Sequence, residues 1–170
     1  VVELLVPDFN GSREAIDTAL SAGPDIFSHN VETVRRLYPS VRKGADYDRS
    51  LGLLAAVRRN AREVRTKSAL MLGLGETTDE VLEALSDLRD AAVDFVALGQ
   101  YLRPGLGQIP VREYIAPAAF DRLAERAREM GFLEVTAGPL VRSSYQENRI
   151  PARGARTGAR PAKRCEEEVR

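Results

Sequence analysis

The chain has 170 residues, 44% of them hydrophobic and 29% charged, a composition that predicts one globular domain with a core of ordinary size. Its 25 Lys and Arg residues balance 25 Asp and Glu residues, so the overall charge does not favour a nucleic-acid partner. No apolar run approaches the roughly 20 residues that span a bilayer, and the first residues do not resemble a signal segment. We therefore expect a soluble, intracellular protein without membrane contact.

The chain contains a single cysteine, Cys165, close to its end. One cysteine makes no disulfide framework, and the sequence before it offers no cysteine-based metal site. The chain also begins without methionine, directly in a strand-like run, so we expect a piece of a longer protein. An apolar first strand without an upstream neighbour would pair with other chains, which predicts aggregation or dimerisation of the isolated piece.

Short apolar runs alternate five times with amphipathic stretches. The apolar runs predict strands at 1–7, 25–30, 67–75, 93–102 and 133–141. The amphipathic stretches predict helices at 13–23, 31–38, 46–60, 77–92 and 117–132. Thr77 and Glu80 form a capping-box pattern at the start of one of them. Apolar strands that alternate with helices are typical of a buried parallel sheet, so the predicted fold class is α/β.

Five such strands suit either an open doubly wound sheet or part of a (β/α) barrel. Polar clusters after the strands favour the barrel, because all its strands end at one mouth. These clusters are Asp8, SHNVET (28–33), GLGET (73–77), GQYLRP (99–104) and RSSY (142–145). We expect them to converge, in a partial barrel that spans 1–146. Residues 147–170, rich in Arg, Ala, Gly and Pro, predict a disordered basic tail.

Each cluster allows a structural and a functional interpretation. The GLGE segment (73–76) is either a tight turn or a place where backbone approaches a ligand. If the strand continues, Asn30 and Glu32 share one side, where an amide and a carboxylate suit ribose hydroxyls or an amino group. His29, the single histidine, is more simply a structural residue than a general base. The RSSY segment is either a strand end that bonds local backbone or part of a site.

Six segments carry a resemblance to a known family. They are VELLVPDF, DIFSHNVETVRRLYPSVRKGADYDRSLGLL, TKSALMLGLGET, FVALGQYLRP, IPVREYIAPAAFDRLAERAREMGF and AGPLVRSSY. In this order and spacing they are similar to the C-terminal half of lipoyl synthase, a radical S-adenosylmethionine (SAM) enzyme. The resemblance covers about residues 1–146. It implies a partial (β/α) barrel of the radical SAM type, of which this chain holds the C-terminal strands and helices.

The resemblance also implies a reaction and its partners. Lipoyl synthases insert two sulfur atoms at C6 and C8 of an octanoyl chain carried on a lipoyl carrier domain or the glycine cleavage H protein. Their cofactors are SAM and two [4Fe–4S] clusters. One cluster cleaves SAM to a radical that abstracts hydrogen, and the auxiliary cluster is consumed as sulfur donor. Iron–sulfur and electron donors are further implied partners, and the implied location is the cytoplasm, or the mitochondrial or plastid matrix in a eukaryote.

Site residues follow from the resemblance by position. Asn30 and Glu32 would contact the ribose or methionine part of SAM. Gly73, Gly75 and Glu76 would line its adenine or ribose.

The RSSY segment is implied to serve the auxiliary cluster. Ser144 would ligate an iron there, since an alkoxide is a hard and labile ligand, and Arg142 would stabilise negative charge beside it. The two cysteine triads that hold the clusters lie upstream of the region that this chain resembles. None is present here, so we expect the chain alone to be catalytically inactive.

Two other hypotheses stay open. The chain could be a metal-free (β/α) enzyme that binds a phosphorylated small molecule at the GLGE segment and the helix after it. The carboxylate of Glu76 argues against this, because it lies where phosphate would bind. Alternatively, the chain could be a non-enzymatic half that associates with a separate, cysteine-bearing polypeptide.

Overall fold

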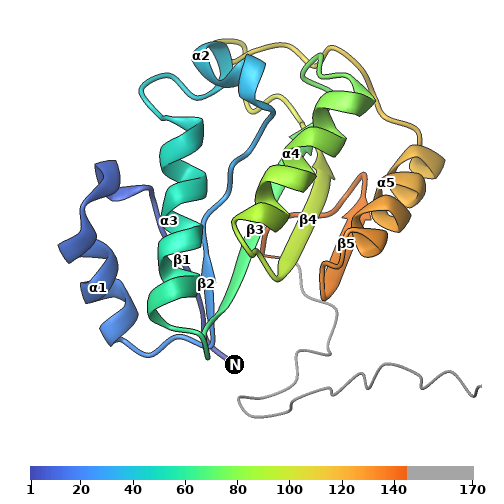
Figure 1. Cartoon of the computed structure of the whole chain (residues 1–170). Helices are drawn as coiled ribbons and strands as arrows, with labels where there is room; N and C mark the ends of the chain where they lie inside the picture. Colours follow the sequence, from blue (N-terminus) through green and yellow to red (C-terminus); the bar gives the residue numbers. More distant parts are fainter. Residues whose placement is uncertain (145–170) are drawn as a thin grey trace, which may run out of the picture.

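The computed structural model describes residues 1–144, so the predicted tail at 147–170 lies outside the described part. Five strands form one sheet, in which each strand is parallel to its neighbours (Figure 1). The strands are β1 (Glu3–Leu5), β2 (Ile26–Ser28), β3 (Arg65–Leu72), β4 (Phe95–Gln100) and β5 (Glu134–Gly138).

Helices connect the strands and lie on one side of the sheet (Figure 1). The α-helices are α1 (Arg13–Ser21), α2 (Tyr38–Val41), α3 (Tyr47–Asn60), α4 (Thr78–Asp90) and α5 (Pro117–Glu129). Two short 3₁₀ helices, η1 (Phe9–Gly11) and η2 (Arg35–Leu37), precede α1 and α2. None of the helices among the described residues is long and apolar enough to cross a membrane.

Strand order separates the two architectures that the sequence allowed. The order is β1-β2-β3-β4-β5, so each strand pairs with its neighbours in sequence. A doubly wound sheet reverses its strand order at a switch point and carries helices on both faces. This sheet has no reversal among its described strands, and Figure 1 shows its helices on a single side. The chain therefore forms an arc of a (β/α) barrel, as predicted.

The hydrophobic core lies between the sheet and the helices. Phe27, Leu70 and Leu98 point into it from the strands and are fully buried against residues such as Leu54 and Leu85 of the helices. Because side chains alternate along a strand, the residues on either side of these three face the inside of the arc. That inner face carries two large apolar residues, Ile26 and Phe95, near the start of its strands. It also carries polar and small residues: Ser28, Lys67, Ala69, Ala97, Gly99 and Gly138.

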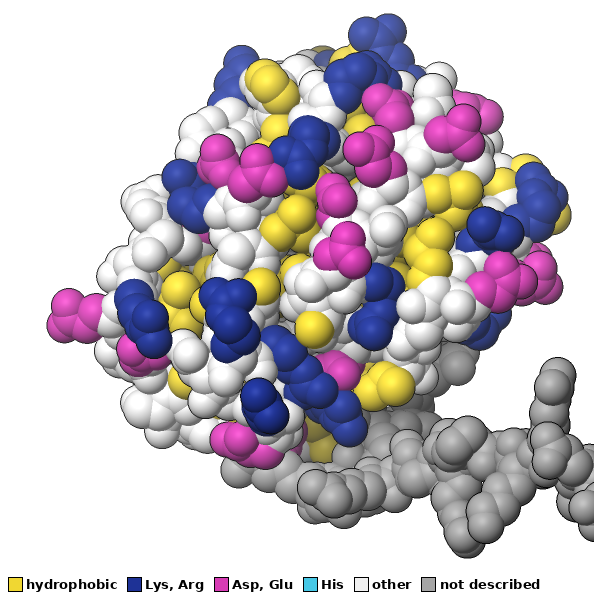
Figure 2. Space-filling view, viewed as in Figure 1, with side chains coloured by type: hydrophobic (Ala, Val, Ile, Leu, Met, Phe, Trp, Pro, Cys, Tyr) yellow, Lys and Arg dark blue, Asp and Glu magenta, His cyan; other side chains and the backbone are white. Residues whose placement is uncertain are grey.

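Local signals place several helix ends. Thr77 caps α4, with its hydroxyl accepting from the Glu80 amide across 3.2 Å while the Glu80 carboxylate accepts from the Thr77 amide across 2.8 Å. This confirms the predicted capping box. Asp46 caps α3 by accepting from the Arg49 amide. On the helical face, basic and acidic side chains are interleaved, without a patch of one sign (Figure 2).

The prediction of a helix over 31–38 was wrong in its first half. The Glu32 amide donates to the Ala69 carbonyl across 2.9 Å, and the Glu32 carbonyl accepts from the Met71 amide across 2.8 Å. These bonds tie the segment to β3 and leave none of that backbone for a helical turn. The helix begins only at Arg35, once the chain has left the sheet.

Candidate active site

A chamber of about 180 Å³ opens at the carboxyl ends of the strands, on the inner face of the sheet. Small residues of β3 and β4 form its base, and polar residues that follow β2 and β5 form its sides. The lining residues are Asn30, Glu32, Ala69, Leu70, Met71, Ala97, Gly99, Gln100, Leu102, Val141, Arg142 and Ser143. This is the mouth at which (β/α) barrels carry their active sites.

Asn30 and Glu32 act together on one wall of the chamber. The Asn30 Nδ2 atom donates to the Glu32 Oε1 atom across 3.2 Å. The Asn30 Oδ1 atom is buried and, among the described residues, has no hydrogen-bond partner. A buried carbonyl oxygen without a partner is costly, and a ligand hydroxyl or ammonium would satisfy it. The wall therefore presents acceptors to a hydrogen-bond donor.

The backbone at Glu32 is held in an unusual conformation, with a φ of +66° that non-glycine residues seldom adopt. The bonds to β3 fix it there, and Arg42 holds Asn30, two residues earlier, by donating to the Asn30 carbonyl across 2.9 Å. Burial raises the pKa of the Glu32 carboxyl, while the Asn30 amide and the Arg42 charge oppose that rise. Strained residues held in this way are often found at functional sites.

Residues 139–144, which we call the strap, close the chamber on the side of β5. The sequence predicted that RSSY ends the last strand, but β5 stops at Gly138, before Pro139. A turn, in which the Val141 amide donates to the Gly138 carbonyl across 3.1 Å, brings the chain back across β4. Proline has no amide to continue a ladder, which explains the early end.

The strap brings part of the RSSY segment into the chamber. Arg142 and Ser143 line it, whereas Ser144 is exposed and is not a lining residue. Tyr145 lies outside the described residues. The guanidinium of Arg142 donates to the Val141 carbonyl across 2.7 Å, and no salt bridge joins it to an acidic side chain of residues 1–144. The chamber lining thus combines a cation from the strap with the acceptors of Asn30 and Glu32.

The GLGE segment packs against the chain itself. The Glu76 carboxylate accepts from the Gly73 amide across 2.5 Å and from the Leu74 amide across 2.9 Å. It fills the position where a phosphate would bind, which disfavours the phosphorylated ligand. A Cβ atom on Gly73 would lie closer than 3.0 Å to the Glu113 carbonyl oxygen, so this glycine accommodates the loop before α5. Gly73, Gly75 and Glu76 do not line the chamber, and their contact with SAM stays a prediction.

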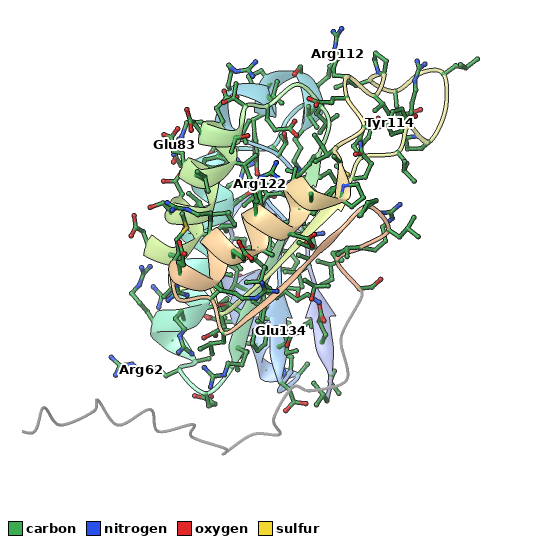
Figure 3. The ribbon with its side chains drawn as sticks, turned by 90° about the vertical axis from the view of Figure 1, so that its right-hand side faces the viewer. Arg62, Glu83, Arg112, Tyr114, Arg122 and Glu134 are labelled. Carbon is green, nitrogen blue, oxygen red and sulfur yellow. The ribbon has the colours of Figure 1, made fainter. Side chains whose placement is uncertain are left out.

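The expected convergence of five clusters was correct only in part. Residues after β2, β4 and β5 meet in the chamber, but Asp8 does not, because its carboxylate pairs with Arg49 of α3 across 2.7 Å. The long loop between β4 and α5 projects beyond the strand ends, where Figure 3 shows Arg112 and Tyr114 far from Glu134 at the opposite end of β5.

His29 is structural, as expected. It is 1% exposed, with its Nδ1 atom 2.9 Å from the Val6 carbonyl oxygen and its Nε2 atom 3.0 Å from the Ser50 hydroxyl. A carbonyl oxygen only accepts, so Nδ1 carries the proton and Nε2 accepts from Ser50. Burial lowers the pKa of the imidazole, which keeps it neutral. The ring joins β1, β2 and α3 and does not reach the chamber.

Residues 1–144 contain no cysteine, and no group of three or more His, Cys, Asp or Glu side chains among them could hold a metal ion. Iron–sulfur clusters are held mainly by cysteine thiolates. The described residues therefore do not make up a cluster site by themselves. The role of Ser144 as an iron ligand stays a prediction.

Sequence reasoning missed the small residues that shape the base of the chamber. Ala69 and Ala97 were considered only as parts of apolar strands, and Gly99 only as the first residue of the GQYLRP cluster. A signal was present, since these residues recur at every second position and would share one face of adjacent strands. Gln100 was expected in the same cluster, but its role was not predicted. Its side chain bonds the carbonyls of Leu72 and Glu113 and the amide of Ile115, so it joins β3 to the loop before α5.

The partial barrel, with a polar chamber at its mouth, defines a protein of the (β/α)-barrel class. Residues 2–88 match the model of the radical SAM superfamily, and the chain belongs to that superfamily. Among curated proteins it is similar to lipoyl synthases. It is 54% identical to that of Nitrosococcus oceani over 152 residues, which cover 89% of this chain and 47% of the relative.

Other lipoyl synthases match to the same degree. Identity is 55% over 145 residues with that of Geobacter sulfurreducens, covering 85% of this chain and 48% of the relative. Identity with the lipoyl synthase of Thermus thermophilus is 50% over 151 residues, which cover 88% of this chain and 47% of the relative. The chain thus spans about half the length of the curated relatives it matches. These matches confirm the resemblance to part of a lipoyl synthase.

Proposed function

We propose that this chain is part of a lipoyl synthase and that its chamber binds SAM. The observation that carries the proposal is the unpaired Asn30 Oδ1 atom beside the Glu32 carboxylate, in a chamber that Arg142 also lines. SAM offers hydroxyls on its ribose and an ammonium on its methionine part, which are donors that the Asn30 oxygen lacks and that the Glu32 carboxylate can also accept from. Its carboxylate suits a guanidinium. The chemistry of the wall therefore fits the cofactor.

The residues of this chain would bind and orient SAM. Asn30 and Glu32 would hold ribose or amino groups, and Arg142 would balance negative charge. When bound together with a reduced iron–sulfur cluster, SAM supplies the hydrogen-abstracting chemistry of this superfamily. The proposed reaction of the whole protein is the insertion of two sulfur atoms at C6 and C8 of an octanoyl chain. Its proposed partners are an octanoylated carrier domain or H protein and iron–sulfur and electron donors, and its proposed location is the cytoplasm, or the mitochondrial or plastid matrix in a eukaryote.

A chimera tests the proposed function. The segment of the Nitrosococcus oceani lipoyl synthase that this chain matches is replaced by this chain, and the chimera is incubated with an octanoyl-lysyl peptide, SAM and dithionite. Mass spectrometry should detect a lipoyl-lysyl peptide. A folded chimera that holds its clusters and cleaves no SAM would contradict the proposal. The unaltered N. oceani protein serves as the control.

We also propose that this chain alone is inactive, because its one cysteine cannot hold a [4Fe–4S] cluster. Anaerobic reconstitution with iron and sulfide should yield no stoichiometric cluster in electron paramagnetic resonance after reduction. A stoichiometric cluster signal would refute this second proposal without affecting SAM binding.

A further inference from the structure

The backbone of the strap lies directly on Gly99 of β4. A Cβ atom at Gly99 would lie closer than 3.0 Å to the carbonyl oxygen of Val141, a separation that real Cβ atoms do not show. The φ of Gly99 is not in the left-handed region, so backbone conformation does not require glycine here. What requires it is the close approach of the strap.

The neighbouring strand offers a natural comparison. Gly138 of β5 is the register partner of Gly99. A Cβ atom at Gly138 would meet only the Cγ2 atom of Val141, at an ordinary distance of 3.5 Å. Two paired glycines therefore differ in one respect: a methyl group at Gly99 meets rigid backbone, and a methyl group at Gly138 meets the end of a side chain.

The position of the strap on β4 determines whether its residues close the chamber. Val141, Arg142 and Ser143 of the strap line the chamber together with Gly99. The Val141 carbonyl that rests on Gly99 also accepts from the Arg142 guanidinium across 2.7 Å. A displacement of this carbonyl would therefore move both the strap backbone and the Arg142 cation that lines the chamber.

We propose that Gly99 is a positioning residue that seats the strap on β4, so that Arg142 and Ser143 complete the ligand chamber. Its effect on ligand affinity rests on the proposed binding of SAM, whereas its effect on the strap does not. Gly99 itself need make no bond to the ligand, since it acts through the strap.

The test compares Gly99→Ala with Gly138→Ala in the full chain of 170 residues. Amide exchange of Val141, followed by NMR, reports strap seating, and titration with SAM reports the chamber. In Gly99→Ala, we expect the Val141 amide to exchange about tenfold faster or more and the SAM dissociation constant to rise about fivefold or more. Both quantities should stay within about twofold of wild type in Gly138→Ala.

Each result has a distinct meaning. Unchanged Val141 exchange in Gly99→Ala overturns the proposal. Faster exchange with unchanged SAM affinity overturns the part that makes the strap a wall of the ligand chamber. If wild-type chain binds no SAM, the proposed function of the chamber fails, while the exchange comparison still decides the role of Gly99.

A second variant covers loss of folding in Gly99→Ala, which circular dichroism would reveal. Val141→Gly loosens the strap without adding an atom to the sheet. It should speed exchange in 140–144 and weaken SAM binding in the same direction. A Val141→Gly chain with wild-type exchange and affinity would contradict the proposal.

Discussion

The Asn30 amide donates to the Glu32 carboxylate across 3.2 Å, while the Asn30 Oδ1 atom, on a residue that lines the chamber, has no partner among the described residues. The amide thus satisfies one neighbour and leaves an acceptor for a ligand. A residue selected only for stability would be expected to have both ends bonded.

Replacement of Asn30 by leucine should therefore separate binding from stability. The change removes a buried unpaired oxygen but also one hydrogen bond, so the free energy of unfolding should change by less than about 1 kcal/mol. SAM affinity should fall about tenfold or more, because a ligand donor loses its acceptor. Isothermal titration and urea unfolding measure the two effects. Asn60→Leu, at the end of α3, is the control and should leave SAM binding unchanged.

The carboxyl of Glu32 should make both stability and binding depend on pH. Because burial raises its pKa above 4.5, the folded chain binds more protons than the unfolded chain between 4.5 and the raised value. Glu32→Gln should thus stabilise the chain near neutral pH, and this gain should shrink as pH falls towards 4.5. SAM binding by the wild type should weaken over the same fall, as the carboxylate takes up a proton. Urea unfolding and titration at several pH values test this; a gain independent of pH would contradict it.

His29 should contribute stability that is present above pH 6.5. Its pKa is lowered by burial, so the unfolded chain binds the proton more readily, and stability is lost as pH falls through 6.5 towards the lowered value. His29→Leu should lose about 1–3 kcal/mol at neutral pH, because the Val6 carbonyl and Ser50 lose a partner. The variant should also lose the part of the pH dependence of its unfolding free energy that His29 causes. Urea unfolding on both sides of pH 6.5 measures this pH dependence. A variant whose unfolding free energy depends on pH as the wild type's does would count against a structural role of His29.

The Arg36 guanidinium links two loops at the mouth. It donates to Glu80 at the start of α4 across 2.6 Å and to the Gly75 carbonyl across 2.9 Å. Its hydrogen bond is the main reason that the pKa of Glu80 is lowered to about 2. In Arg36→Met this pKa should rise towards 4.5, as followed by carboxyl carbon NMR. In the control Arg35→Met, which breaks a similar exposed pair with Asp48, it should remain low. Equal rises in both variants would refute the specific contact.

Three glycines should respond differently to alanine. Gly52→Ala, inside α3 with open space around it, should stabilise the chain by about 0.5–1 kcal/mol. Gly23→Ala, with a φ of +67° and open space, should destabilise it by about 1 kcal/mol. Gly73→Ala adds a clash with the Glu113 carbonyl to a φ of +97° and should cost more than Gly23→Ala. Urea unfolding gives the free energy of unfolding of the three variants. If Gly73→Ala lowers it by less than Gly23→Ala, the loop before α5 moves to accommodate the added methyl group.

The sequence was most informative where one local cause decides the structure. The capping pair of Thr77 and Glu80 and the alternation of apolar runs with helical stripes placed most elements. That Asn30 and Glu32 lie on the same side was also predictable. They are two residues apart, and the alternation of side chains continues beyond the end of β2, so that both line the chamber. Burial of His29 followed from the same alternation.

Other features depend on contacts between distant segments. The φ of +66° at Glu32 results from bonds to β3, about 40 residues further along the chain, and no local pattern announces them. The sequence predicted a strand that runs to residue 141 with RSSY at its end, whereas β5 stops at Gly138 and the turn after it folds Val141 back onto Gly99. The GLGE segment was predicted to be either a tight turn or an approach to a ligand, and no local pattern indicated that Gly73 also makes room for the chain's own loop before α5.

Binding of SAM in the chamber that Asn30 and Arg142 line is tested most directly by NMR titration of the wild-type chain with SAM. We expect saturable shifts of the Asn30 side-chain amide and of the Gly99 and Ser143 backbone amides, and we expect the two backbone shifts to be lost in the double variant Asn30→Leu, Glu32→Gln. Shifts that map elsewhere, shifts that persist unchanged in the double variant, or none at all would contradict it.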